Sequence, residues 1–309
     1  MNRANLLRMG LLALIWGSSF LLIKFAVEGL APTQVVLGRL AAGAAVLLVI
    51  VVVTRQPLPR APAVWGHVAL MGIVANIVPF FLFAWGEQRI TSGMAGVLNG
   101  TTPLFTLAFA LMALTEERWS LQRFSGLLLG FVGVVVVVGP WNTEGRVNPV
   151  SGQLACLGAA ACYGVAFVYT RRFLANRGYP PLSLSAAQLI MATVLLALVA
   201  PVVASDPTRL TPLVVVSVLL LGAVGTGLAY LLFYRLISEV GSTSASMVTY
   251  LIPIVAVVLG VVVQSDPVTW NLFVGAAVVL VGAAMAAGRL SLRPATEAPV
   301  APAREEISG

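Results

Sequence analysis

The sequence predicts an all-α integral membrane protein with ten transmembrane helices, arranged as two inverted five-helix repeats. Three observations predict this fold: a very apolar composition, ten apolar segments of spanning length, and an ordered series of matches between the two halves. Of the 309 residues, 59% are hydrophobic and only 9% are charged, whereas soluble domains carry about 25% charged residues. A water-soluble fold is therefore excluded.

Ten apolar segments lie between charged or Pro- and Asn-rich breaks, each near the roughly 20 residues that a spanning helix needs. The predicted helices are Asn5–Val27, Pro32–Val53, Pro62–Trp85, Ile90–Leu114, Leu121–Val138, Val150–Thr170, Pro181–Val203, Leu210–Tyr234, Val240–Val263 and Val268–Ala287. Valine runs would favour strands in water, but strands in lipid require a closed barrel with alternating polarity, which this sequence lacks. The first segment shows no clear cleavage site, so we expect it to be retained rather than removed as a signal peptide.

The arginines indicate the orientation, because basic residues concentrate in cytoplasmic loops. Ten helices place both termini on one side. If that side is the cytoplasm, it holds Arg3, Arg8, Arg55, Arg60, Arg118, Arg123, Arg171, Arg172, Arg177, Arg235, Arg289, Arg293 and Arg304, and the other side holds only Arg89, Arg146 and Arg209. The preference for arginine over lysine is typical of a GC-rich bacterial genome. We therefore expect a bacterial inner-membrane protein with both termini in the cytoplasm and a disordered tail over residues 289–309.

The two halves match in order, at an offset that drifts only between 147 and 150 residues. The matched pairs are Trp16 with Tyr163, Lys24 with Arg171, Pro32 with Pro181, Arg39 with Gln188, Gly72 with Gly222, Phe80 with Tyr230, Pro103 with Pro253, and Glu117 with Asp266. Five helices per half make the second half start on the opposite side, so the repeats are inverted. Inverted repeats are typical of transporters, whose substrate site lies near the midplane between them.

With Trp16-Gly17-Ser18-Ser19-Phe20 in the first helix, Arg39 in the second, Pro103 in the fourth and Glu117 before the fifth, the chain resembles the ten-helix drug/metabolite transporter superfamily, EamA type. The resemblance divides the chain into a first EamA-like repeat (1–140), a periplasmic linker (141–149) and a second repeat (150–288). It implies an exporter of amino acids, other metabolites or toxic compounds. It also implies a cavity lined by helices one, three, four, six, eight and nine, with helices five and ten behind them. Tyr163 and Gln188 depart from the family pattern.

Three prolines, Pro79, Pro103 and Pro253, fall inside predicted helices beside polar residues. Proline cannot donate a backbone hydrogen bond, so each frees the carbonyl four residues earlier. A freed carbonyl in lipid must find a partner or line a wet cavity. We therefore predict kinks at these prolines, with Asn76, Asn99 and Thr249 as substrate-binding residues. The alternative is an ordinary kink in which Ser or Thr hydroxyls bond back to their own helix.

Several aromatic residues fall near the middle of helices, although aromatics usually mark membrane interfaces. A buried Trp or Tyr needs a partner for its N–H or O–H. We predict a pocket wall for an apolar or aromatic solute, formed with Ser19 by Trp16, Phe80, Tyr163, Tyr230, Tyr234 and Tyr250. The alternative is helix packing with local hydrogen bonds.

Lys24 and Arg39 lie toward the outer ends of the first two helices. Basic side chains near helix ends commonly reach out to the interface, and Lys24 can also pair with Glu28. The alternative is an outer vestibule that attracts carboxylates, for which the deeper Arg39 is the better candidate. Gly126, Gly130 and Gly133 share one face of the fifth helix, and Gly275, Gly282 and Ala286 share one face of the tenth, so we interpret both faces as packing surfaces.

The eleven carboxylates all map to loops, helix ends or the tail. Ion-driven pumps often carry a carboxylate inside the membrane, so we expect exchange or downhill export. No Walker-type segment is present, which excludes ATP hydrolysis in this chain. We expect no metal, cofactor or nucleic acid, because the sequence has one histidine, no metal-ligand spacing and scattered basic residues.

The expected partners are therefore a small-molecule substrate and the lipid bilayer. The predicted function is a transporter, in the direction of export, of amino acids or drug-like solutes by alternating access. A lipid or lipid-sugar flippase is the alternative. An intramembrane enzyme is disfavoured, because no nucleophile with a base, metal set or carboxylate pair converges.

Overall fold

The computed structural model describes residues 3–115, 117, 119–139, 141, 148–175, 177–203, 208–267 and 269–290. Within these ranges the secondary structure elements are all helices, which confirms the predicted fold class. The helices are α1 (Arg3–Ala26), α2 (Pro32–Val53), α3 (Pro62–Gly72), η1 (Ile73–Ile77), α4 (Val78–Glu87), α5 (Ser92–Asn99), α6 (Thr102–Ala113), α7 (Leu121–Val138), α8 (Val150–Phe173), α9 (Pro181–Val203), α10 (Pro212–Leu219), η2 (Leu220–Leu228), α11 (Ala229–Ala245), α12 (Val248–Gln264) and α13 (Trp270–Ala286). Most of the predicted linker and the predicted tail beyond residue 290 lie outside the described residues.

Eight helices of the described chain are long and apolar enough to span a membrane, and α12 and α13 are shorter apolar helices. Three of these spans each consist of more than one helical segment. The third is α3, η1 and α4, the fourth is α5 and α6, and the eighth runs from α10 through η2 to residue 241. Both η segments are π-helical, and π-helical turns are frequent at functional sites.

The boundary between the eighth and ninth spans differs from the prediction. The expected break after Tyr234 is helical, and the chain turns instead at Gly241, whose φ of 79° suits glycine. The charged turn stays helical because Glu239 accepts hydrogen bonds from Arg8 and Arg235. The ninth helix therefore begins at Val248, not at Val240 as predicted.

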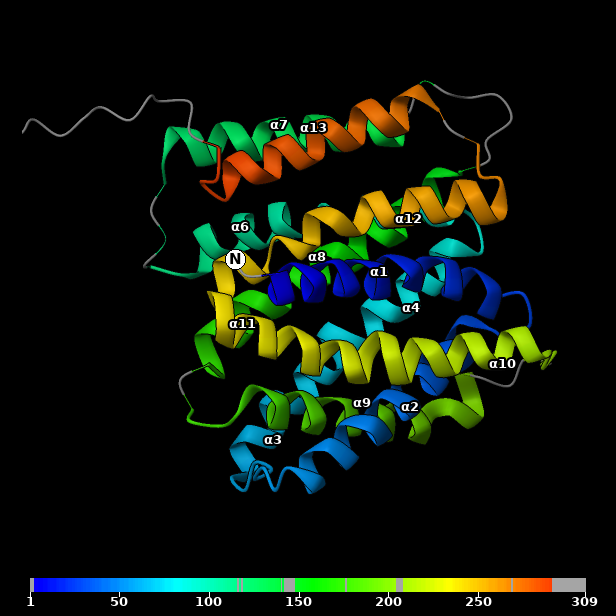
Figure 1. Cartoon of the computed structure of the whole chain (residues 1–309), viewed down its shortest axis with the longest axis vertical. Helices are drawn as coiled ribbons and strands as arrows, with labels where there is room; N and C mark the ends of the chain where they lie inside the picture. The colour runs from blue at the N-terminus through cyan, green and yellow to red at the C-terminus, as the bar shows by residue number, and fades with distance from the viewer. Residues whose placement is uncertain are drawn as a thin grey trace, which may run out of the picture.

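The most extensive helix contacts join one half of the chain to the other. Helix α1 packs on α12, α2 on η2 and α9, α3 on α9, and α4 and α6 on α8. Helices α7 and α13 pair along the upper edge in Figure 1, away from the remaining bundle. The start of α1 and the end of α13 lie at the left of that view, and we call this side the terminal face. The other ends of the spans form the opposite face.

The predicted packing role of the glycine faces is confirmed in the α7–α13 pair. A Cβ atom added at Gly126 would lie 2.4 Å from the Ala286 nitrogen, and one at Gly282 would lie 2.4 Å from the Gly130 nitrogen. One at Gly133 would lie 2.6 Å from the Val279 nitrogen. Only glycine lets the two backbones approach this closely, so these helices form a scaffold.

Candidate functional site

Two polar contacts, one buried and one partly buried, connect the halves at the π segments. The Nε of Arg39 on α2 donates to the Oγ1 of Thr226 in η2 at 3.2 Å. The Nε2 of Gln188 on α9 donates to the Oδ1 of Asn76 in η1 at 2.5 Å. Arg39 and Gln188 are matched in the predicted repeat, and Thr226 follows Asn76 by 150 residues, so the two contacts occupy equivalent positions.

The π geometry of η1 has a local cause. Pro79, at the start of α4, supplies no backbone donor, and the N–H of Val78 bonds the Ile73 carbonyl five residues back. In η2, which contains no proline, the Oγ1 of Thr226 donates to the Leu221 carbonyl at 3.0 Å. The wide turns place Asn76 and Thr226 opposite α9 and α2 respectively.

One face of the third span carries the core of the site. Asn76, Phe80, Phe83 and Glu87 follow one another at helical spacing, and all four are buried. The guanidinium of Arg39, itself only 9% exposed, lies 3.8 Å from the centre of the Phe80 ring, a favourable arrangement for a cation. The Arg39 charge also interacts with the Tyr163 and Tyr230 hydroxyls and with Glu87.

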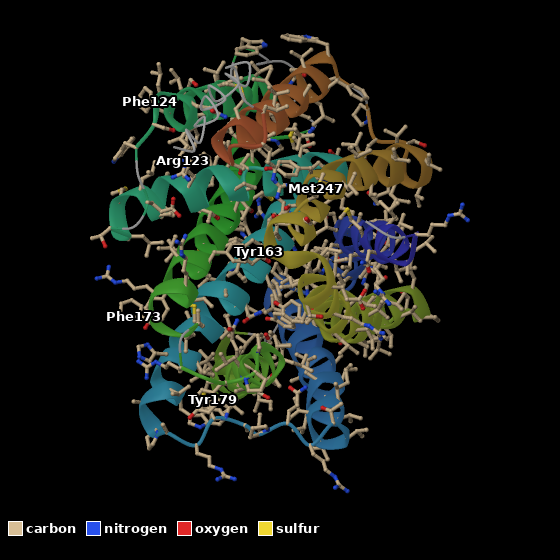
Figure 2. All side chains as sticks on the ribbon, turned by 60° about the vertical axis from the view of Figure 1, so that its left-hand side comes forward. Arg123, Phe124, Tyr163, Phe173, Tyr179 and Met247 are labelled. Carbon is tan, nitrogen blue, oxygen red and sulfur yellow. The ribbon has the colours of Figure 1, made fainter. Side chains whose placement is uncertain are left out.

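The aromatic residues near this face come from several helices. Phe83 has its ring centre 5.5 Å from that of Phe20 on α1 and 6.1 Å from that of Tyr163 on α8. Tyr163 lies near the middle of the molecule in Figure 2. The Tyr230 ring stands 6.2 Å from Tyr234, whose hydroxyl bonds the Ser185 hydroxyl at 2.7 Å. The predicted aromatic residues Phe80, Tyr163, Tyr230 and Tyr234 therefore come together.

Glu87 was expected at a helix end, outside the membrane interior. It does end α4, but its side chain is completely buried, and neither carboxylate oxygen has a hydrogen-bond partner in the described chain. The Lys24 ammonium donates to the backbone carbonyls of Glu87 at 2.6 Å and Ile90 at 2.9 Å. Lys24 therefore caps the end of α4 rather than pairing with Glu28.

Trp16 and Ser19 lie on α1 beside η2. The indole Nε1 of Trp16 donates to the Gly225 carbonyl at 3.1 Å, and its ring meets Phe233 edge-on at 5.2 Å. The Ser19 hydroxyl bonds back to the Ile15 carbonyl at 3.0 Å. Trp16 thus satisfies its polar atom by a contact between the halves.

The other predicted residues lie apart from this cluster or have local partners. The Thr102 hydroxyl donates to the Asn99 carbonyl at 2.7 Å, which is the ordinary-kink alternative at Pro103. The Thr249 hydroxyl bonds back to the Ser246 carbonyl, three residues earlier on the same chain. The Tyr250 hydroxyl reaches the Ala283 carbonyl of α13 at 3.3 Å, on the scaffold side. Pro253 lies inside α12.

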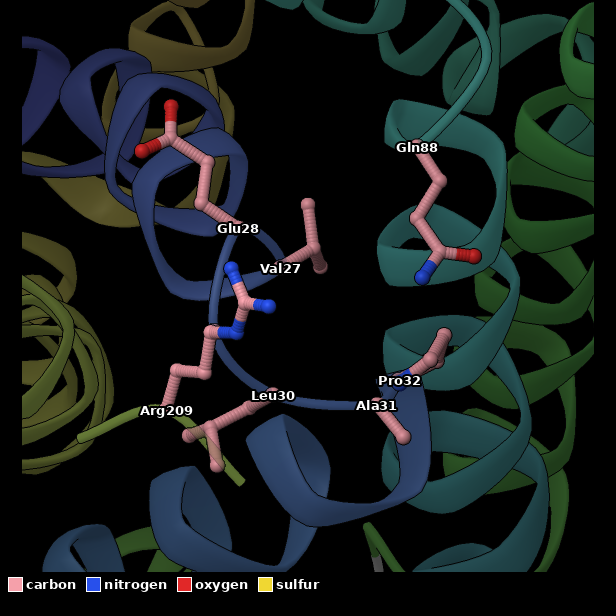
Figure 3. A pocket seen from close by; sticks show the side chains of 8 residues that line it. Val27, Glu28, Leu30, Ala31, Pro32, Gln88 and Arg209 are labelled. Carbon is pink, nitrogen blue, oxygen red and sulfur yellow. The ribbon is translucent and has the colours of Figure 1, made fainter. Parts of the chain in front are cut away.

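A pocket of about 480 Å³ opens at the opposite face (Figure 3). It is lined by Val27, Glu28, Gly29, Leu30, Ala31, Pro32, Gln88 and Arg209. Gln88 lies across the pocket from Glu28 and Arg209. Gln88 directly follows Glu87, and Val27 comes three residues after Lys24. The pocket therefore borders the ends of α1 and α4, close in sequence to Lys24 and Glu87.

The terminal face, in contrast, is held together by ion pairs. Glu117 accepts from Arg123 on α7 at 2.7 Å and from Arg171 at the end of α8 at 2.6 Å. Glu239 pairs with Arg8 of α1 and, at 3.3 Å, with Arg235. The bond from Arg171, with that from Arg123, holds the pKa of the Glu117 carboxyl below its ordinary value. The Arg171–Glu117 and Arg8–Glu239 pairs join the halves at the face opposite the pocket.

Sequence reasoning missed three members of the cluster: Glu87, Thr226 and Gln188. Glu87 carries a detectable signal, since it lies four residues after Phe83, seven after Phe80 and eleven after Asn76. This spacing places all four on one helix face. Thr226 and Gln188 were detectable only as repeat positions of Asn76 and Arg39.

Comparison with known proteins gives consistent results. The sequence matches the EamA-like transporter family over residues 6–139 and 150–288. It is 24% identical to YoaV, an uncharacterized transporter of Bacillus subtilis, over 87% of this chain and 91% of the relative. It is 28% identical to YedA, an uncharacterized inner membrane transporter of Escherichia coli, over 81% of this chain and 79% of that protein. A solved crystal structure that is 20% identical superposes with a TM-score of 0.64, over 93% of this chain and 97% of the other, which shows a shared fold.

Proposed function

Because this chain belongs to the EamA-like transporter family and is a multi-pass membrane transporter, we propose that it exports small organic metabolites, such as amino acids or drug-like solutes, by alternating access. The proposed location is the bacterial inner membrane, with both termini in the cytoplasm. The solute binds between the two repeats, among Arg39, Phe80 and the buried tyrosines.

One observation carries this proposal: the equivalent contacts Arg39–Thr226 and Gln188–Asn76 connect the halves at the two π segments. Polar groups at this depth are costly unless they serve a cavity or pathway. A pocket at the opposite face and ion pairs at the terminal face are the asymmetry expected of an outward-facing state. Exchange of conformation between inverted repeats reverses such an asymmetry.

The test is counterflow in proteoliposomes loaded with a mixed amino-acid pool. Wild type is expected to exchange labelled amino acids saturably. Arg39→Gln removes a buried charged group that contacts both halves, so exchange should fall by about tenfold or more. Arg55→Gln changes an exposed arginine just beyond the end of the same helix and should leave exchange within about twofold of wild type.

Exchange that is unaffected by Arg39→Gln would move the site elsewhere. Folded protein that exchanges no amino acid or drug-like solute, but scrambles labelled lipid, would replace the proposal with the lipid flippase.

A further inference from the structure

Glu87 is the most unusual buried group in the described chain. Both of its carboxylate oxygens are inaccessible and without a hydrogen-bond partner. A buried carboxylate is costly unless it is paired or hydrogen-bonded, and removing one partner of a buried pair leaves a penalty of several kcal/mol. The position therefore suits a partner that arrives from outside the chain.

The groups that face Glu87 define the chemistry of that partner. Its charge interacts with Lys24 of α1, with Arg39 of α2 and with Asp266 beyond α12, and it acts on the Cys156 thiol of α8. Lys24 and Arg39 each have other partners, namely the two carbonyls at the end of α4 and the Phe80 ring with Thr226. Neither cation donates a hydrogen bond to the Glu87 carboxylate.

The surroundings also suit an organic cation. The end of a helix carries partial negative charge and favours ammonium groups, and the carbonyls of Glu87 and Ile90 already accept from the Lys24 ammonium. Phe83 lies one helical turn before Glu87, and the rings of Phe20 and Tyr163 stand beside the Phe83 ring. Aromatic faces attract desolvated organic cations.

We propose that the Glu87 carboxylate binds the protonated amine of the transported solute, which reaches it from the pocket at the opposite face. This assignment rests on the proposed function and names the substrate class of the same site. With Glu87 ionised, as it is when an ammonium group is bound to it, Lys24, Arg39, Glu87 and Asp266 sum to zero formal charge. A solute that carries a carboxylate as well as the amine keeps that balance. The terminal nitrogens of Arg39, which make no hydrogen bond to the described chain, then receive the carboxylate.

Three probes that share one aromatic ring separate these contributions: labelled phenylalanine, phenethylamine and 3-phenylpropionate. Counterflow is measured for wild type, Glu87→Gln and Glu87→Asp. Glu87→Gln should slow exchange of the two amine-bearing probes by about tenfold or more and leave phenylpropionate within about twofold. Glu87→Asp retains the charge and should recover part of the amine exchange. Equal loss for all three probes, or no loss for any, would overturn the assignment.

A second readout does not depend on transport. Dicyclohexylcarbodiimide adds to protonated carboxyl groups in apolar surroundings, and the labelled peptide is located by mass spectrometry. Labelling is expected at Glu87, persisting in Glu28→Gln, which changes an exposed carboxylate of the pocket. Phenethylamine should slow the labelling, and phenylpropionate should not. Absence of labelling overturns amine binding. Labelling that slows when the pH is changed, but not when phenylalanine or phenethylamine is added, also overturns it. The second result identifies Glu87 as a site for a proton only.

The two measurements allow the Glu87 assignment and the proposed transport function to be refuted independently. If folded wild type exchanges no solute at all, the transport proposal fails, while amine protection from carbodiimide still decides whether Glu87 binds amines. If wild type exchanges amino acids and Glu87→Gln exchanges them equally well, transport stands and the Glu87 assignment fails.

Discussion

The close approach of Gly222 to α2 sets the separation of the halves at the buried cluster, and a single methyl group tests it. In Gly222→Ala the added Cβ would lie 2.5 Å from the Arg39 carbonyl oxygen and 2.5 Å from Ala42 Cβ. Ordinary contact begins near 3.4 Å, so η2 and α2 must separate locally by about 0.9 Å, the difference between these distances. The Arg39–Thr226 bond, already 3.2 Å long, would then exceed hydrogen-bonding distance.

Two opposing terms set the expected size of the effect. Overpacking of this kind costs about 1–3 kcal/mol, while alanine gains up to about 1 kcal/mol over glycine in a helix. Gly66→Ala lies on the exposed side of α3, and no atom lies within 4 Å of the added Cβ. This variant therefore has only the helix-propensity gain of alanine and no overpacking cost. The free energy of unfolding of Gly222→Ala should therefore lie about 1–3 kcal/mol below that of Gly66→Ala.

The repeat offers a graded comparison. Gly72 is the matched position in the first half, and its added Cβ would lie 3.2 Å from the Ala192 nitrogen and 3.3 Å from the Gln188 carbonyl oxygen. Thermal unfolding of the purified variants in detergent should rank Gly66→Ala above Gly72→Ala above Gly222→Ala, with amino-acid exchange lost first in Gly222→Ala. Equal stability of Gly222→Ala and Gly66→Ala would refute the close contact between α2 and η2.

Three further outcomes follow from the same geometry. Thr226→Val keeps the side-chain shape but removes the acceptor for Arg39, and should destabilise the protein by about 1–3 kcal/mol in chemical unfolding; an unchanged midpoint would show that the 3.2 Å contact contributes nothing. Trp16→Phe keeps an aromatic ring against Phe233 but leaves the Gly225 carbonyl without its hydrogen-bond donor. The solute concentration for half-maximal exchange should therefore rise by about fivefold or more. An unchanged concentration would place Trp16 outside the transport pathway. The Glu117 pKa is lowered when its arginine partners are in place, so the contribution of these ion pairs to closure of the terminal face is complete above the ordinary carboxyl range and is lost as pH falls through the lowered pKa. Labelling of Ala113→Cys, at the end of α6, should therefore increase with acidification in wild type and depend less on pH when Glu117→Gln is also present. Identical pH profiles with and without Glu117→Gln would refute the role of Glu117 in closing this face.

The spans and the repeat could be predicted from the sequence because both follow from local physics. Lipid offers no hydrogen-bond partners to the backbone, so apolar segments of sufficient length must be helical, and nine predicted segments begin within two residues of the observed helices. The glycine faces of α7 and α13 were likewise predictable, since close helix contact requires small residues at helical spacing. The break at Tyr234 was wrong because charged residues were interpreted as a loop, although Glu239 pairs with Arg235 of the same helix and with Arg8 of α1.

The sequence by itself thus determined a helical membrane fold, its approximate spans and an internal repeat, because hydropathy and residue order carry that information. Only the tertiary structure decided which polar residues meet. Lys24 bonds carbonyls 63 and 66 residues away, Arg39 meets Thr226 across the two halves, and the Asn99 carbonyl accepts from the Thr102 hydroxyl three residues later. Glu87 lies at the end of a helix in the sequence, yet the packing of α1, α2 and α8 around α4 removes it from solvent. Burial and partnership depend on how distant helices approach one another, and no local pattern encodes that distance.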